Sequence, residues 1–245
     1  MTDDDNTQET HPAITGFAGA MARFPWPDHP SLEAVEPFTW HLGGGLGLFT
    51  EILSRHPEAI VLEVCTFMGG ATRTWLSKYS ALRCLCVSNW DDKLVDYVRK
   101  LKATSWAIDA VGEEQLEQYA KLLEQHGAIN IVQNNLAEFS ERCILVPLSE
   151  QKAFTELASL DLRPDVIILH RPRKALLQSA HEYFPNAILT GGDWNWGKEE
   201  DYPVRQAAQD IADRRGGRIE TRGSLFVISE PRHGAPYNED TAEAD

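Results

Sequence analysis

Positive charge and long apolar runs are both scarce in this sequence. Lys and Arg number 23 against 37 Asp and Glu, which leaves a net charge of −14. Such a field repels phosphate backbones and anionic lipid surfaces, so neither nucleic acid nor a membrane is expected as a partner. The apolar run at residues 59–65 is interrupted by Glu63 and is far shorter than the roughly 20 residues that a membrane helix needs.

Cysteine is scarce too, with four residues that lack the spacing of a metal site. We therefore expect reduced, buried thiols at Cys65, Cys84, Cys86 and Cys143. Cys84 and Cys86 share one face of a predicted strand and could bind a metal only with ligands from elsewhere. The acidic, polar first ten residues are unlike a secretory signal, so a cytoplasmic location is expected.

What the sequence does contain is an alternation of short apolar runs with longer helical patterns from residue 59 onward. This alternation is typical of a parallel sheet covered by helices on both faces. Residues 113–125 add a helix that reads as an insertion. Strands are predicted at 60–65, 83–88, 143–148, 165–170 and 187–191, and helices at 46–55, 71–79, 92–102, 151–157 and 174–184.

The last third predicts a bounded helix followed by two strands. Asp201 is its expected N-cap, Pro203 lies in its first turn, and Gly216 follows its end. Residues 218–221 and 224–229 then form a tight antiparallel hairpin. We predict four segments: a disordered acidic tail at 1–12, a lead-in or lid at 13–58, an α/β domain at 59–230 and a disordered tail at 231–245. The glycine-rich run at 43–47 lacks the ending of a phosphate loop and favours a hinge.

The turn at residues 63–72, Glu-Val-Cys-Thr-Phe-Met-Gly-Gly-Ala-Thr, joins a predicted strand to a helix. It resembles the opening loop of the small class I S-adenosylmethionine-dependent O-methyltransferases, specifically the macrocin-type sugar O-methyltransferases and the cephalosporin-hydroxylase-like group. Segments 87–91, 163–170 and 189–196 resemble later motifs of this family in the same order. The resemblance spans residues 59–229 and implies a Rossmann-like methyltransferase fold: a mostly parallel seven-stranded sheet with a C-terminal antiparallel hairpin and helices on both faces.

The resemblance implies S-adenosylmethionine as the candidate cofactor, yet three positions depart from the family pattern. Cys65 stands where the family has glycine, and Ser88 stands where an aspartate binds the ribose hydroxyls. Residues 151–152, Gln-Lys, replace the pair beside adenine. Asp91 or Asp92 could reach the ribose, although capping the next helix is the favoured role. The residues predicted to bind the cofactor are Glu63, Cys65, Thr66, Gly69, Gly70, Ser88 and Trp90.

The metal site of the family is also altered. Relatives that use a divalent cation hold it with carboxylates at the positions of His170, Gly192 and Asp193, of which only one is an acid here. No metal is expected. His170 and Asp193 are the candidate catalytic residues, each as a general base; alternatively His170 faces solvent or caps a backbone group.

Two further groups are candidates for binding a substrate. Arg171 and Arg173 form a basic cluster that either pairs with an anionic ligand or stays solvated at a helix start. Trp194 and Trp196 either form an aromatic wall for a ligand or pack a lid.

Three hypotheses about function follow. The first is a methyltransferase-fold protein with degraded cofactor and metal sites, a non-catalytic or altered-ligand homologue that binds a small molecule or a protein partner. The second is an active, metal-independent methyltransferase acting on a small hydroxylated or anionic substrate. The third, compatible with the first, is an oligomerisation module that forms a homo-oligomer through the lead-in and the helix at 113–125.

Overall fold

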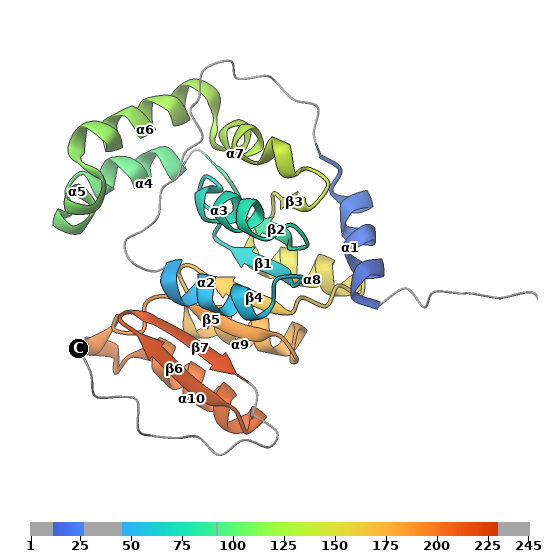
Figure 1. Cartoon of the computed structure of the whole chain (residues 1–245). Helices are drawn as coiled ribbons and strands as arrows, with labels where there is room; N and C mark the ends of the chain where they lie inside the picture. The colour runs from blue at the N-terminus through green and yellow to red at the C-terminus, as the bar shows by residue number, and fades with distance from the viewer. Residues whose placement is uncertain (1–11, 27–45, 92, 230–245) are drawn as a thin grey trace, which may run out of the picture.

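The computed structural model describes residues 12–26, 46–91 and 93–229, and a seven-stranded sheet runs through its centre (Figure 1). The strand order is β3-β2-β1-β4-β5-β7-β6. The first five strands are parallel, whereas β7 is antiparallel to both β5 and β6. The strands are β1 (Ile60–Val64), β2 (Arg83–Val87), β3 (Cys143–Val146), β4 (Val166–Leu169), β5 (Ile188–Gly191), β6 (Arg218–Arg222) and β7 (Leu225–Ser229).

Helices cover both faces of the sheet, which explains why β1, β3 and β4 are buried at every position. One apolar cluster lies under α2, α3, α6 and α7, and the other lies under α1, α8, α9 and α10. The helices are α1 (Pro12–Arg23), α2 (Leu46–Arg55), α3 (Gly70–Lys78), α4 (Lys93–Leu101), α5 (Ser105–Val111), α6 (Glu113–His126), α7 (Ala128–Leu136), α8 (Glu150–Ser159), α9 (Lys174–Tyr183) and α10 (Pro203–Arg215).

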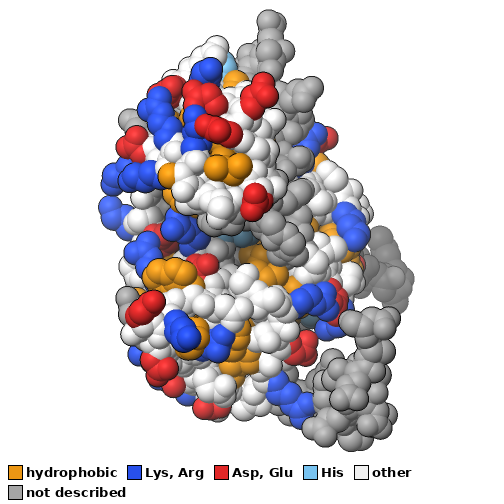
Figure 2. Space-filling model, turned by 90° about the vertical axis from the view of Figure 1, so that its left-hand side faces the viewer, with side chains coloured by type: hydrophobic (Ala, Val, Ile, Leu, Met, Phe, Trp, Pro, Cys, Tyr) orange, Lys and Arg blue, Asp and Glu red, His pale blue; other side chains and the backbone are white. Residues whose placement is uncertain are grey.

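The segment α4–α6 forms an arm that extends from one end of the sheet (Figure 1). Helix α4 packs along α6, and the pair is joined on its outer side by ion pairs such as Lys102 Nζ to Glu117 Oε2 at 2.7 Å. Charged side chains of both signs are spread over this arm, and a hollow separates it from the part of the molecule that carries the C-terminal hairpin (Figure 2).

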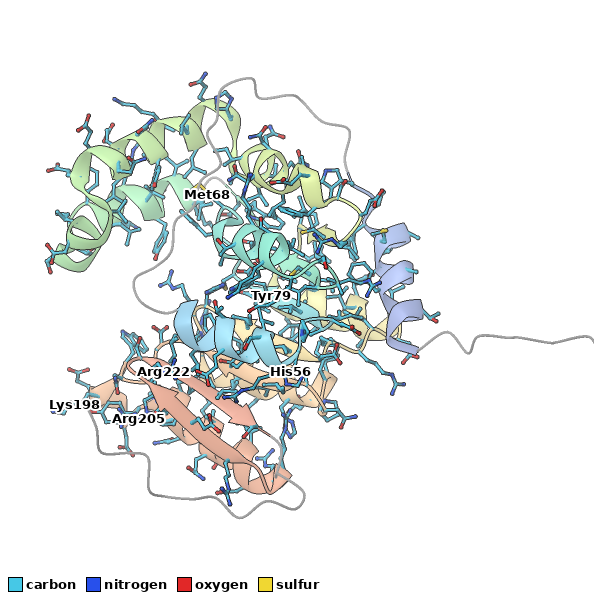
Figure 3. The ribbon with its side chains drawn as sticks, viewed as in Figure 1. His56, Met68, Tyr79, Lys198, Arg205 and Arg222 are labelled. Atoms are coloured by element: carbon cyan, nitrogen blue, oxygen red, sulfur yellow. The ribbon has the colours of Figure 1, made fainter. Side chains whose placement is uncertain are left out.

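The C-terminal hairpin is tied to the N-terminal part of the chain through α2. Arg222 in β6 lies beside α2 (Figure 3) and contacts Glu51 Oε2 at 2.8 Å. The hydroxyl of Tyr79, just after α3, donates to the backbone oxygen of Thr50 at 3.2 Å. Helix α2 is thereby tied both to β6 and to the end of α3.

The predicted fold class is confirmed: the sheet has seven strands, the C-terminal strands form the antiparallel hairpin, and helices lie on both faces. The predicted helices all appear within a few residues of their expected bounds, including the insertion, which is α6. Helices α1, α5 and α7 were not predicted. Residues 1–11 of the tail predicted at 1–12, the tail predicted at 231–245 and the first part of the 43–47 glycine run lie outside the described residues, whereas Pro12 is the first residue of α1.

One capping prediction is wrong. Helix α10 begins at Pro203 with Tyr202 as its N-cap, and no side chain caps it. Asp201 lies one residue too early, in a left-handed conformation at the end of a short 3-10 turn. Its carboxylate instead accepts a hydrogen bond from Gln206 Nε2 at 3.0 Å.

Among the described residues, no helix has both the length and the apolar character needed to cross a membrane.

Candidate functional site

The carboxyl ends of β1, β2, β3 and β4 meet at one edge of the sheet, where the predicted site residues lie. The register pairs Val64 with Val87 on one side and with Leu169 on the other. Residues just beyond these strands are therefore neighbours, although they are far apart in the sequence. Ligands of open α/β sheets bind at this edge.

The turn after β1 depends on a conformation that only glycine adopts without strain. Gly69 has φ of +77°, and a Cβ there would lie 2.9 Å from Leu136 Cδ1 of α7. Asn135 of the same helix donates to the backbone oxygen of Met68 at 2.8 Å. Met68 is buried below this turn (Figure 3). Gly69 is therefore required by the fold itself, and Gly70 is the first residue of α3.

A pocket of about 140 Å³ opens beside this turn. Three of the predicted cofactor residues line it, namely Cys65, Ser88 and Trp90. Glu63, Thr66, Gly69 and Gly70 are not in its lining, and their predicted contact with a cofactor stays a prediction. The full lining consists of Cys65, Ser88, Asn89, Trp90, Asp91, Leu94, Ser149 and Glu150.

Cys65 lines the pocket and has a strained backbone conformation. Its φ is +63°, in the left-handed region that costs residues with a Cβ roughly 1–2 kcal/mol. Its Sγ lies 3.5 Å from Glu150 Oε1, so the thiol donates toward the start of α8. Burial raises the pKa of this thiol to about 12, with Glu150 as a further cause. The thiol is therefore protonated and narrows the pocket between β1 and α8.

Ser88 and Trp90 form the wall of the pocket that follows β2. Ser88 offers a neutral hydroxyl where a carboxylate would accept two hydrogen bonds. Trp90 is buried, and its Nε1 donates to the backbone oxygen of Phe67 at 2.9 Å, which fastens the β2 loop to the β1 loop. Asp91 Oδ1 accepts a hydrogen bond from the backbone N–H of Lys93, the first residue of α4, at 3.2 Å, and Asp91 also lines the pocket.

Residues 151–152, which the resemblance places beside adenine, do not line the pocket. Gln151 and Lys152 are exposed on α8. Ser149 and Glu150 line the pocket instead, because α8 begins at Glu150 and turns the next residues outward. Sequence comparison missed these two residues, since a shift of two positions in a short loop leaves no signal in the motif.

A buried pair of ionisable side chains joins the ends of β1 and β4. Glu63 Oε1 lies 2.6 Å from His170 Nε2. The exposed fraction is 2% for the Glu63 side chain and 20% for that of His170. The hydroxyls of Thr66 and Thr72 both donate to Glu63 Oε2. Burial alone would raise the pKa of Glu63, but the contacts with His170 and the two threonines outweigh it and lower that pKa.

The candidate metal position does not fit a hard divalent cation. His170 is engaged with Glu63, and Gly192 supplies no side chain. Asp193 has φ of +58°, and burial raises the pKa of its carboxyl while Arg171 opposes that shift. Within the described part of the chain, no group of three or more His, Cys, Asp and Glu is arranged to hold a metal ion.

Arg171 faces Tyr97 of the arm, with its Cζ 5.0 Å from the centre of the ring. Tyr97 also makes an edge-to-face contact with Phe67 of the β1 loop, at 6.3 Å between ring centres. Burial raises the pKa of the Tyr97 hydroxyl, and Arg171 partly opposes this. The sequence analysis missed Tyr97, because it belongs to the insertion and not to any motif. Arg173 is exposed at the N-cap of α9.

The two tryptophans after β5 differ in their surroundings. Trp194 packs on Phe226 of β7, with 5.6 Å between ring centres, and its backbone oxygen accepts from Arg205 Nε at 2.7 Å. Arg205 stacks over Tyr202 at 4.0 Å and holds this loop (Figure 3). Trp196 is 62% exposed. Packing thus accounts for Trp194, whereas the exposed ring of Trp196 can contact a ligand or partner.

Comparisons with known proteins find likeness only at the level of structure. No protein-family model and no curated protein matches the sequence. A Staphylococcus aureus structure assigned as a caffeoyl-CoA O-methyltransferase aligns at 9% identity and a TM-score of 0.47, over 90% of this chain and 93% of that one. An O-methyltransferase from Bacillus cereus in complex with SAH aligns at 13% identity and 0.44, over 93% and 94%.

A fibrillarin pre-rRNA processing protein from Methanococcus jannaschii aligns at 9% identity and a TM-score of 0.44, over 70% of this chain and 65% of that one. Identities and scores this low carry no inference about ligand or reaction. The fold rests on the strand order β3-β2-β1-β4-β5-β7-β6 with an antiparallel β7 and on the helices that cover both faces. By these features the chain has the Rossmann-like methyltransferase fold.

Proposed function

We propose that this chain is a methyltransferase-fold protein with an altered ligand site, which serves as a binder or partner and does not carry out metal-dependent methyl transfer. The observation that supports this most directly is the position of Cys65, whose thiol stands in the pocket against Glu150. The lining of the pocket is largely polar, with Ser88, Asp91 and Glu150 among its residues. A small polar ligand, such as a nucleoside fragment, suits this lining better than whole S-adenosylmethionine.

The finer parts of this proposal rest on the sequence. The motifs at 63–72 and 189–196 favour the macrocin-type and cephalosporin-hydroxylase-like group of O-methyltransferases as the origin of the fold. A protein partner or a second copy of the chain stays part of the proposal, with the exposed ring of Trp196 as its candidate contact. A cytoplasmic location stays part of the proposal, because the four cysteines are free thiols.

A second function is favoured by a specific observation, the contact of 2.6 Å between Glu63 and His170. An imidazole held at the end of β4 is suited to accept a proton without a metal. The chain would then be a metal-independent O-methyltransferase for a small hydroxylated or anionic substrate, which Arg171 and Arg173 would orient. Asp193, whose pKa is raised by burial, is the other candidate base.

Calorimetric titration with S-adenosylmethionine and S-adenosylhomocysteine separates the two functions. We expect the wild-type protein to show no micromolar binding of either compound. Ser88→Asp combined with Cys65→Gly should raise affinity at least tenfold, because a charged hydrogen bond contributes about 1.5–3 kcal/mol and the thiol no longer blocks the pocket. Ser105→Asp, the same charge change on the exposed start of α5, is the matched control.

Micromolar binding of S-adenosylmethionine by the wild-type protein would contradict the altered-ligand proposal and favour the second function. Methyl transfer to a panel of small phenols and sugars would then be measured for His170→Ala and Asp193→Ala. Turnover that both variants leave unchanged would show that neither side chain is the base.

A further inference from the structure

The pair formed by Glu63 and His170 is held in place by the register of strands β1 and β4 and by a contact with helix α2. Glu63 pairs with Ile168 across β1 and β4, so His170 lies two residues beyond its partner, on the same face of the sheet. The backbone N–H of His170 donates to the oxygen of Val64 at 3.3 Å. Phe49 of α2 packs edge-to-face on the imidazole, with 6.0 Å between ring centres. The ring is thus oriented from three elements.

The hydrogen bonds of Glu63 determine its protonation state. One oxygen, Oε2, receives the hydroxyls of Thr66 and Thr72, and the other, Oε1, is adjacent to His170 Nε2. Donors at both oxygens favour the ionised carboxylate, which can only accept. A buried carboxylate without such partners would be strongly unfavourable, so the network is needed to keep the charge.

An ionised Glu63 fixes the tautomer of His170. Because the carboxylate only accepts, the hydrogen between Oε1 and Nε2 belongs to Nε2. The other nitrogen of a neutral imidazole, Nδ1, then carries a lone pair. Among the described residues, none forms a hydrogen bond with this nitrogen, and the side chain of His170 is 20% exposed. The carboxylate would also stabilise the imidazolium that forms when Nδ1 takes up a proton.

We propose that Glu63 is a positioning residue that holds His170 in the Nε2–H tautomer, so that Nδ1 serves as the proton acceptor for a hydroxylated ligand at this edge of the sheet. In that step the O–H bond of the ligand breaks, its electron pair stays on the oxygen, and the proton bonds to Nδ1. The use of this proton in methyl transfer rests on the second function proposed above. The tautomer of His170 and the accessibility of its Nδ1 do not rest on that function, so both can be tested without measuring turnover.

The test is the pattern of long-range ¹H–¹⁵N couplings of the imidazole rings in the full-length, ¹⁵N-labelled protein near pH 8. His170→Gln identifies the His170 signals by their loss. We expect a single Nε2–H tautomer in the wild-type protein, with Nδ1 at the shift of an unprotonated nitrogen. Glu63→Gln should convert this signal to a mixture of tautomers, whereas Glu114→Gln, at an exposed acid on α6, should leave it unchanged.

The wild-type spectrum alone decides the tautomer, even if Glu63→Gln fails to fold. A dominant Nδ1–H tautomer at His170 would overturn the proposal.

The accessibility of Nδ1 is tested by brief treatment with diethyl pyrocarbonate and peptide mass spectrometry. We expect His170 to be modified in the native protein, as exposed His56 is (Figure 3). Modification of His170 only after unfolding would show that Nδ1 is not available to a ligand and would overturn its role as acceptor.

Discussion

Because the backbone at Cys65 is left-handed, we expect the protein to be more stable with glycine at this position than with alanine. Its φ of +63° costs any residue with a Cβ roughly 1–2 kcal/mol, and a glycine at this position would remove this cost. Glycine in turn loses about 0.5–1 kcal/mol to the greater entropy of the unfolded chain. We therefore expect Cys65→Gly to be more stable than Cys65→Ala by about 0.7 kcal/mol.

The absolute values follow from the half-buried thiol. Both variants lose its packing and its weak contact with Glu150, worth about 1 kcal/mol. Cys65→Ala keeps the strain and should be less stable than the wild-type protein by that amount. Cys65→Gly should lie within about 0.5 kcal/mol of the wild-type protein, because the relief of strain offsets the lost packing.

Urea unfolding, followed by tryptophan fluorescence, gives these differences as shifts of the midpoint at constant slope. Cys84 supplies the matched control, because it is buried in the regular part of β2. There Cys84→Gly should be less stable than Cys84→Ala by about 1 kcal/mol. If alanine were also the more stable residue at position 65, the left-handed conformation of Cys65 and the pocket shape that depends on it would be refuted.

Three further predictions concern the same edge of the sheet and its support. Gly69→Ala should destabilise by about 2–4 kcal/mol, since φ of +77° and contact with Leu136 act together. Gly223→Ala, at φ of +60° with open space around it, should cost only about 1–2 kcal/mol, and equal losses in urea unfolding would contradict this. The pKa of Glu63 is lowered from its usual 4.5, so the stability that the ionised carboxylate contributes is present above pH 4.5 and is lost as the pH falls through the folded-state pKa. The difference in free energy of unfolding between the wild-type protein and Glu63→Gln should therefore shrink over that pH range, and a constant difference would disprove the ionised state. Arg142 donates to three backbone oxygens at the end of α3 and before β2. Arg142→Met should therefore lower the free energy of unfolding by about 2–4 kcal/mol in the same assay. A loss below about 0.5 kcal/mol would show that water replaces these hydrogen bonds.

Sequence periodicity predicted the central strands and the insertion because these signals are local. The strands were recognised as short, continuous apolar runs, which burial on both faces requires. Helix α6 showed its apolar stripe at positions 116, 119, 120 and 123, and all four residues are buried. By contrast, α5 and α7 were missed: α5 is short, and α7 carries asparagines and glutamine that read as a loop yet are partly buried against α3.

The candidate site divides in the same way. Cys65, Ser88 and Trp90 could be assigned from sequence, because they follow strands at the edge where the ligands of this fold bind. Glu150 and Tyr97 could not, since one depends on where α8 begins and the other on how the arm folds back over the β1 loop. The left-handed conformation of Cys65 was equally hidden, because a cysteine at such a position carries no sequence signature.

The sequence by itself determined the α/β class, the succession of the seven strands along the chain and the loss of acids at the metal position, since each of these is recorded in neighbouring residues or in their alternation. Only the tertiary structure decided that Glu63 faces His170, its partner 107 residues later in the chain. That contact arises because parallel strands β1 and β4 lie side by side in register, and pairing between distant strands leaves no trace in the local pattern of either one.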